Sequence, residues 1–233
     1  MKNIKSLFIV FILVAACMMS CKNSEAEAQD ETTTTEAAES EATAEVKNET
    51  TEAKGVLNVN LATEADLQGL ELPSEVIATI LSNRPFLDMM DLDKMLMDSN
   101  KEELYKQMFV PLNLNTTAEA DFKIIPGVGD RMAHEFEEYR PYTSIKQFRK
   151  EIGKYVDEAE VERYLNYVFV PVELNTASEE DIKALPGVGK KMTHEFEEYR
   201  PYKSMDQFRK EIGKYVDDNE LERLERLVYL KDN

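Results

Sequence analysis

The chain has no tryptophan, and its only two cysteines both lie within the first 21 residues. Without a cysteine after residue 21, the rest of the chain cannot form an internal disulfide and must be held together by packing. The one long apolar run, residues 7–16, is much shorter than the roughly 20 residues that a membrane-spanning helix needs. The sequence therefore predicts a folded part that depends on its hydrophobic core alone.

The residues that catalysis or a metal centre would need are also scarce. The two histidines, His134 and His194, occupy equivalent places on the polar side of expected helices. His194 and Glu198 stand four residues apart, but two ligands do not make a metal site. We find no nucleophile beside a base, no carboxylate pair in a defined cleft and no phosphate-transfer loop. We therefore expect no enzyme activity, no cofactor and no bound metal.

The N-terminus has the pattern of an export signal with a lipidation site. Two lysines precede the apolar run, and two cysteines follow it. The small residues of Val14-Ala-Ala-Cys17 suit a lipoprotein signal peptidase, whereas Cys21 stands where the chain turns polar. We interpret residues 1–21 as a lipoprotein signal peptide and favour Cys21 as the lipidated cysteine, with Cys17 as the alternative.

Residues 22–54 consist mainly of Glu, Thr and Ala. So few apolar groups cannot offset the entropy lost on ordering, and like charges extend the chain. We therefore expect a disordered acidic tether that holds the folded part away from a bilayer. An acid-rich stretch soon after the cysteine also resembles the signals that some Gram-negative bacteria use to move lipoproteins to the cell surface. We expect an outer-membrane lipoprotein of a Gram-negative cell envelope, facing the periplasm or the cell surface.

The folded part contains a repeat with an offset of 60 residues. Residues 134–142 return unchanged at 194–202, and residues 147–157 return unchanged at 207–217. The same glycine turn precedes each copy, as Pro126-Gly-Val-Gly129 and Pro186-Gly-Val-Gly189. Such an offset indicates an array of one structural unit. The expected modules are residues 55–111, 112–171 and 172–233.

Each complete module predicts four short helices, so we expect an all-α fold. In the third module, capping residues stand before the expected helices and the glycine turn, Pro201 and Gly213 end them. The expected caps are Thr116/Glu119, Ser144/Gln147 and Asp157/Glu160, and then Thr176/Glu179, Ser204/Gln207 and Asp217/Glu220. We expect Leu221, Leu224 and Val228 to face inward from the last helix. Phe109-Val-Pro111 and Phe169-Val-Pro171 are expected to be extended connectors, and residues 112–233 are expected to fold without the first module.

Four groups of residues in the third module carry a family resemblance. They are Leu174-Asn-Thr-Ala177, Leu185-Pro-Gly-Val-Gly-Lys-Lys191, Tyr199-Arg200 and Ile212-Gly-Lys214. In this order and spacing they resemble the tandem helix-hairpin-helix domain of the ComEA family of competence DNA receptors. Two features depart from that pattern. Glu151 and Glu211 replace a glycine of the second hairpin, and Leu70-Glu-Leu-Pro-Ser74 replaces the glycine turn in a degenerate first module.

The resemblance implies a way of binding DNA. Backbone N–H groups of Gly187, Val188 and Gly189, with the positive end of the next helix, would hold a phosphate, and Lys190 and Lys191 would add charge. The second module offers the weaker set Gly127, Val128, Gly129 and Arg131, because Asp130 stands beside the phosphate position. A tight turn needs glycine even where nothing binds, so a purely structural role for the turn stays open.

Charge decides between the two classes of partner that we consider. Residues 1–54 hold 5 of the 28 basic and 10 of the 46 acidic residues, so the remainder has a formal charge of −13. A domain this acidic repels a duplex at long range. Tyr and Arg in Tyr139-Arg-Pro-Tyr142 and its copy are residue types enriched at protein interfaces. We therefore favour a non-enzymatic scaffold that contacts an envelope protein, with weak sequence-independent binding of duplex DNA by the third hairpin as the alternative.

Overall fold

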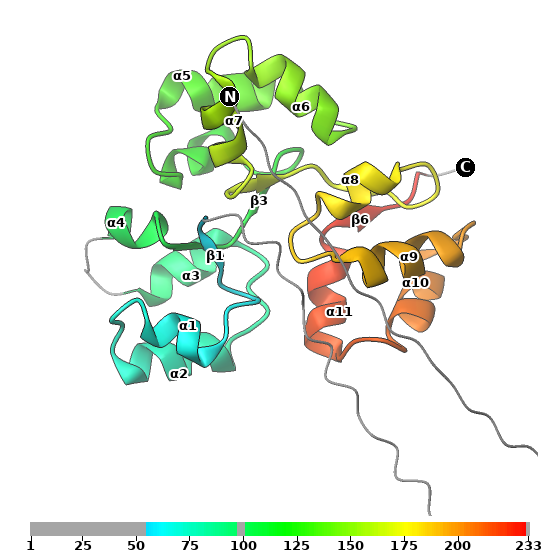
Figure 1. Cartoon of the computed structure of the whole chain (residues 1–233), viewed down its shortest axis with the longest axis horizontal. Coiled ribbons are helices and arrows are strands. Elements are labelled where there is room, and N and C mark those ends of the chain that lie inside the picture. The colour runs from blue at the N-terminus through cyan, green and yellow to red at the C-terminus, as the bar shows by residue number, and fades with distance from the viewer. Residues whose placement is uncertain (1–54, 97–100, 232–233) are drawn as a thin grey trace, which may run out of the picture. The chain divides into compact units, whose positions relative to one another are not determined.

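The computed structural model describes residues 55–96 and 101–231. The signal peptide, the tether, Cys17 and Cys21 lie outside the described residues, so these expectations stay predictions. The described chain is mostly helical (Figure 1). None of its helices is long and apolar enough to cross a membrane.

The elements form three segments of similar order, each framed by two short strands (Figure 1). The first segment contains β1 (Leu57–Asn58), α1 (Glu64–Gln68), α2 (Ser74–Ser82), α3 (Met89–Met95), α4 (Lys101–Tyr105) and β2 (Met108–Phe109). The second contains β3 (Leu112–Asn113), the 3-10 helix η1 (Glu119–Ile124), α5 (Asp130–Glu138), α6 (Ile145–Ile152), α7 (Glu158–Tyr164) and β4 (Val168–Phe169). The third contains β5 (Val172–Glu173), α8 (Glu179–Lys183), α9 (Lys190–Glu198), α10 (Met205–Ile212), α11 (Asp218–Glu225) and β6 (Val228–Tyr229).

The expectation of a mostly helical fold is confirmed, but short strands are present that it did not include. The first and last strands of each segment pair in parallel, as β1 with β2, β3 with β4, and β5 with β6. Val228 therefore lies in β6 and not on the last helix, which ends at Glu225. Strands of two residues show no alternation in a sequence, and their pairing depends on contacts between the distant ends of a segment. The expected connectors at Phe109 and Phe169 are in part these strands.

Four of the six expected helix caps are confirmed, and two are wrong. The confirmed caps are Ser144, Asp157, Ser204 and Asp217. Thr176 does not cap α8: the Ser178 hydroxyl accepts the Asp181 N–H at 3.1 Å, while Thr176 donates to Glu173 Oε2 at 2.6 Å. Thr116 does not cap η1, which follows Ala118 without a side-chain cap. In both cases the helix begins two residues later than expected, because the sequence before it offers more than one residue that could cap it.

An asparagine near the start of each segment ties it to the loop after the second helix. In the third segment, Asn175 Nδ2 donates to Tyr202 O at 2.9 Å, and Tyr202 N–H donates to Asn175 Oδ1 at 2.7 Å. Arg200 adds hydrogen bonds to Leu174 O and Ala177 O at 2.6 and 2.9 Å. Asn60 and Asn115 make the same paired contacts in the other segments. These bonds fix the position of the helices that carry the glycine turns.

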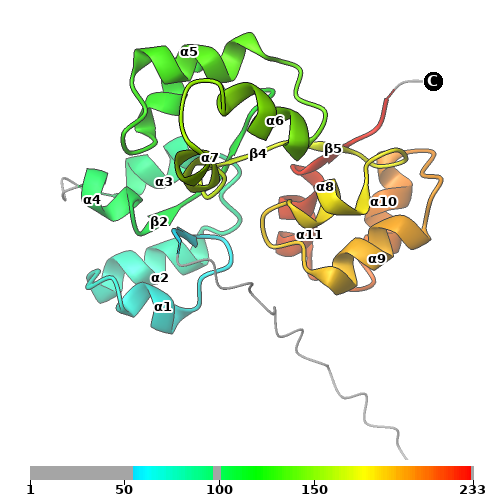
Figure 2. The ribbon, with the colours of Figure 1, turned by 45° about the horizontal axis from the view of Figure 1, so that its top comes forward.

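Apolar side chains form two separate cores. The first core joins the first and second segments, where the rings of Phe109 and Tyr167 meet edge to face with centroids 4.9 Å apart. The second core is built on Phe196, Phe208 and their neighbours in the third segment, and it also includes Phe169 of β4. Figure 2 shows the helices α8 to α11 of the third segment as one group. Tyr142 and Tyr202 are buried in these cores, which corrects their interpretation as interface residues.

Candidate phosphate-binding hairpins

The first glycine of each turn is required by the backbone. Gly127 and Gly187 have φ values of +79° and +72°, in the left-handed region that side chains other than glycine rarely adopt. In the first segment Glu71 adopts φ +57° at the equivalent position. The first segment therefore shares the positive φ of the other two turns, although it has lost their glycines.

The backbone N–H of the central valine in each turn is not available to donate to a phosphate. Val128 and Val188 are buried, and their N–H groups donate to Ile125 O at 3.0 Å and to Leu185 O at 3.1 Å. These donors are already used within the turn. The structure thus removes both valines from the expected set of phosphate ligands.

The second glycine of each turn has no such internal reason. Gly129 and Gly189 have φ values of −94° and −81°, which any residue adopts. A β-carbon built on either one would meet no atom of the described residues within 4 Å. Both glycines are exposed and directly precede a helix. Their lack of a side chain leaves room for an outside group to approach the backbone.

The helix that follows the turn differs in charge between the two segments. Lys190 and Lys191 are exposed at the start of α9. At the start of α5, Asp130 instead forms an ion pair with Lys123 at 2.9 Å. Arg131 lies with its guanidinium carbon 5.7 Å from the centre of the Tyr155 ring. The positive end of α9 is therefore reinforced by lysines, whereas that of α5 is opposed by a carboxylate.

Other basic residues of the third segment are neutralised by neighbours. Arg209 forms ion pairs with Asp206 at 2.6 Å and with Glu225 at 2.5 Å. Lys214 pairs with Glu211, the residue that replaces a glycine in the family pattern. Because two of its three members are paired with carboxylates, the set Arg209, Lys210 and Lys214 does not form a continuous basic track.

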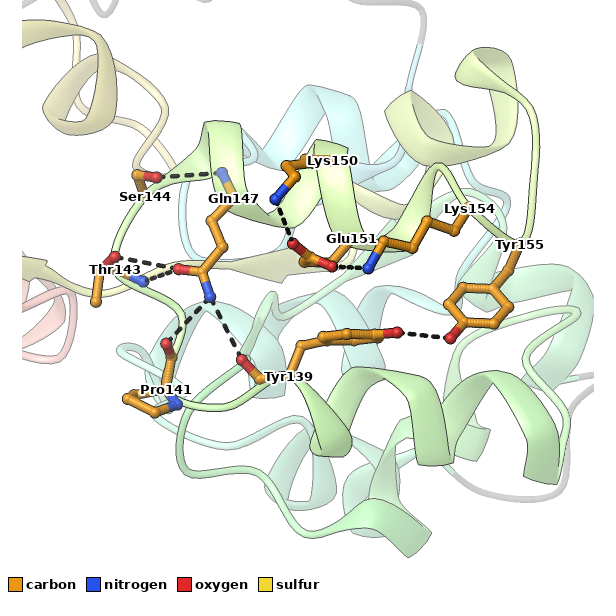
Figure 3. Close-up of polar contacts among 9 residues, drawn as sticks. All are labelled: Tyr139, Pro141, Thr143, Ser144, Gln147, Lys150, Glu151, Lys154 and Tyr155. Carbon is orange, nitrogen blue, oxygen red and sulfur yellow. Dashed lines mark hydrogen bonds and ion pairs between the residues drawn. The ribbon is translucent and has the colours of Figure 1, made fainter.

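Figure 3 shows the same arrangement in the second segment. Glu151 lies between Lys150 and Lys154 and pairs with both. Lys154 Nζ also lies 4.7 Å from the centre of the Tyr139 ring. The hydroxyls of Tyr139 and Tyr155 are 2.6 Å apart, and this hydrogen bond raises the pKa of Tyr155. Tyr139 is thus held within its own segment, so it offers little to a protein partner.

Two arginines behind the turns were missed in the sequence, one of them buried and the other half-buried. Arg223 is 3% exposed, donates to Pro186 O at 2.6 Å and pairs with Glu220 at 2.6 Å. Arg163 pairs with Glu160 at 2.7 Å in the second segment. The signal was the Glu-x-x-Arg spacing repeated in the last helix of both segments, which alone is indistinguishable from a surface ion pair.

The histidines lie on the exposed faces of α5 and α9. His134 Nδ1 is 3.4 Å from Glu119 Oε2, and His194 Nε2 is 3.4 Å from Glu198 Oε2. The hydrogen bond with Glu119 raises the pKa of His134. Within residues 55–96 and 101–231, no three potential metal ligands come together.

Comparison with known proteins bears on the third segment. Residues 168–228 match the family model described as a helix-hairpin-helix motif. The match spans α8 to α11 and includes the turn at Gly187. Neither curated proteins nor solved structures gave a match.

Proposed function

We propose that this protein is an exported, lipid-anchored and non-enzymatic binding protein whose third hairpin contacts the sugar-phosphate backbone of DNA. Its folded part would be three tandem helix-hairpin-helix modules, residues 55–111, 112–171 and 172–233, of the ComEA type. The observation that carries the proposal is the empty space at Gly189, where neither the backbone nor packing needs a glycine. A phosphate approaching there would meet free N–H groups at the start of α9 and the side chains of Lys190 and Lys191.

Charge limits how tightly such a site can bind. The formal charge of −13 after residue 54 opposes a polyanion, and ion pairs already occupy Arg209 and Lys214. Only a few phosphates can then be neutralised, so the affinity should decrease only moderately as the salt concentration rises. We expect binding without base readout, weaker than about micromolar at physiological salt.

A pair of charge reversals tests the site. Lys190→Glu with Lys191→Glu should weaken binding of a fluorescent duplex by about tenfold or more at low salt, because two cations beside the phosphate become anions. Arg131→Glu is the matched control in the second hairpin and should cost little, since Asp130 already opposes a phosphate there. Equal losses in the two variants would contradict a site on the third hairpin, and no binding by the native chain would leave both turns purely structural.

A protein partner in the cell envelope is the second candidate. It is favoured by the acidic balance and by the carboxylates paired with Arg209 and Lys214, which suit a DNA surface poorly. Chemical cross-linking in intact cells would test it. A cross-linked partner lost on reversing surface charges, with no DNA binding by the purified chain, would decide for this candidate. DNA binding with no cross-linked partner would decide against it.

The lipid anchor has its own test. We expect a fatty-acid analogue to label the protein in cells of a Gram-negative host, and Cys21→Ser to abolish the labelling because no other cysteine follows it. Cys17→Ser is the matched control. Loss of label only in the Cys17 variant would move the site to Cys17, and unchanged labelling in both variants would refute an anchor on either cysteine.

A further inference from the structure

The peptide bond between Pro186 and Gly187 is held by an arginine from the last helix of the same segment. Arg223 of α11 donates from Nη1 to Pro186 O at 2.6 Å. Its Nε and Nη2 donate to the two carboxylate oxygens of Glu220 at 2.7 and 2.6 Å. Because Arg223 is only 3% exposed, water does not compete for these bonds. The ion pair fixes the guanidinium, and the guanidinium in turn fixes the carbonyl of Pro186.

This contact determines the direction of the next backbone N–H. The peptide bond after Pro186 is trans and planar, so its C=O and N–H groups point in opposite directions. With Pro186 O turned toward Arg223, the N–H of Gly187 points away from that side chain. Gly187 is exposed, and its N–H donates to no acceptor among the residues that the structure describes. The turn therefore presents a free donor two residues before Gly189.

The equivalent arginine of the second segment lacks this contact. Arg163 keeps both hydrogen bonds to Glu160, each at 2.7 Å, but it is half-buried and makes no hydrogen bond to the turn within the described residues. Arg163, Pro126 and Gly127 instead line an open pocket of about 560 Å³. The two turns share one sequence, so the bond from the arginine to the turn is a feature of the third hairpin alone.

We infer that Arg223 is a positioning residue of the third hairpin, which holds the N–H of Gly187 outward as a donor to a DNA phosphate. The inference rests on the proposed DNA-binding function and adds the residue that prepares its site. Without the contact, the peptide samples other orientations, and the apparent affinity falls with the fraction of molecules in the competent one. Arg223 is buried and paired, so it neutralises no phosphate itself and does not contribute to the salt dependence of binding.

Arg223→Met removes the contact and tests the inference in the full chain. We expect this variant to bind a fluorescent duplex about tenfold more weakly at low salt, with an unchanged slope of affinity against salt concentration. Arg163→Met is the matched control: it also breaks an ion pair but no bond to a turn, and it should leave the affinity unchanged. Arg223→Lys keeps the charge but not the planar fork of donors, so it should also bind more weakly. It serves as the second variant should the methionine unfold the segment, which thermal melting would detect.

Amide hydrogen exchange measured without DNA separates this role from the proposed function. The N–H of Val188 donates to Leu185 O across the turn, and the N–H of Phe208 donates to Ser204 O at the start of α10. A loosened turn should accelerate exchange at Val188 relative to Phe208, whereas general destabilisation of the segment accelerates both.

Faster relative exchange at Val188 in the Arg223 variants, without DNA binding by the native chain, supports the positioning role and refutes the proposed function. Unchanged relative exchange in the folded variants overturns the positioning role, and so does faster exchange with an unchanged, measurable affinity. An equal loss of affinity in Arg163→Met overturns it as well. A smaller salt slope in both Arg223 variants would also overturn it, because Arg223 would then contact a phosphate itself.

Discussion

A fragment of residues 168–233 is expected to unfold in a single cooperative transition, as a helical domain with its own core. Every side chain of the second core lies between Phe169 and Leu230, so the cut removes none of them. The fragment also keeps Arg226 over the ring of Phe169, at 5.2 Å from the ring centre. Urea unfolding followed by circular dichroism would measure this transition.

The longer fragment, residues 112–233, should behave differently. Its second segment loses Phe109, whose ring packs on Tyr167, and removing such a buried ring costs about 3–5 kcal/mol. That loss is comparable with the whole stability of a small domain. We therefore expect two transitions, with the second segment unfolding at lower urea than the third.

Phe109→Ala in the full chain is the matched control for the longer fragment and should lower the stability of the first core alone. A broad, non-cooperative transition in residues 168–233 would mean that the third segment depends on the other two. A single sharp transition in residues 112–233 would restore the expectation, made from the repeat, that these residues fold as a complete unit.

The helices could be predicted from the sequence because their signals are local. Ser204 and Gly213 mark the two ends of α10 through bonds that span only three or four residues. The paired strands could not be predicted, since β5 and β6 are separated in the sequence by four helices and each has only two residues. The positive φ of Glu71 could not be predicted either, because nothing in a sequence marks a glutamate that adopts this conformation.

The candidate site was predicted only in outline. The motif located the turn, but it could not distinguish Gly187, which the backbone requires, from Gly189, which it does not. Nor could it reveal that the Val188 N–H is occupied by Leu185 O.

Asn175→Ala is expected to lower the free energy of unfolding of the third segment by about 2–4 kcal/mol. The change removes both hydrogen bonds to the backbone of Tyr202, whose residue is 3% exposed, and leaves a donor and an acceptor without partners. Each such buried group costs about 1–3 kcal/mol when it is left unsatisfied. Urea unfolding of the full chain would measure the loss.

Two further variants separate the hydrogen bonds from a general effect of losing an amide. Asn175→Asp keeps an oxygen for the Tyr202 N–H but loses the donor to Tyr202 O, so its loss of stability should fall between those of the native chain and Asn175→Ala. Asn83→Ala removes an exposed asparagine that donates to Thr79 O at 2.8 Å, and it should change stability by less than about 0.5 kcal/mol. Water can replace the lost hydrogen bond at the exposed end of a helix, but it cannot reach the backbone of Tyr202 behind its buried ring. Equal losses of stability for the Asn83 and Asn175 variants would therefore contradict a stabilising role for the paired hydrogen bonds between Asn175 and Tyr202.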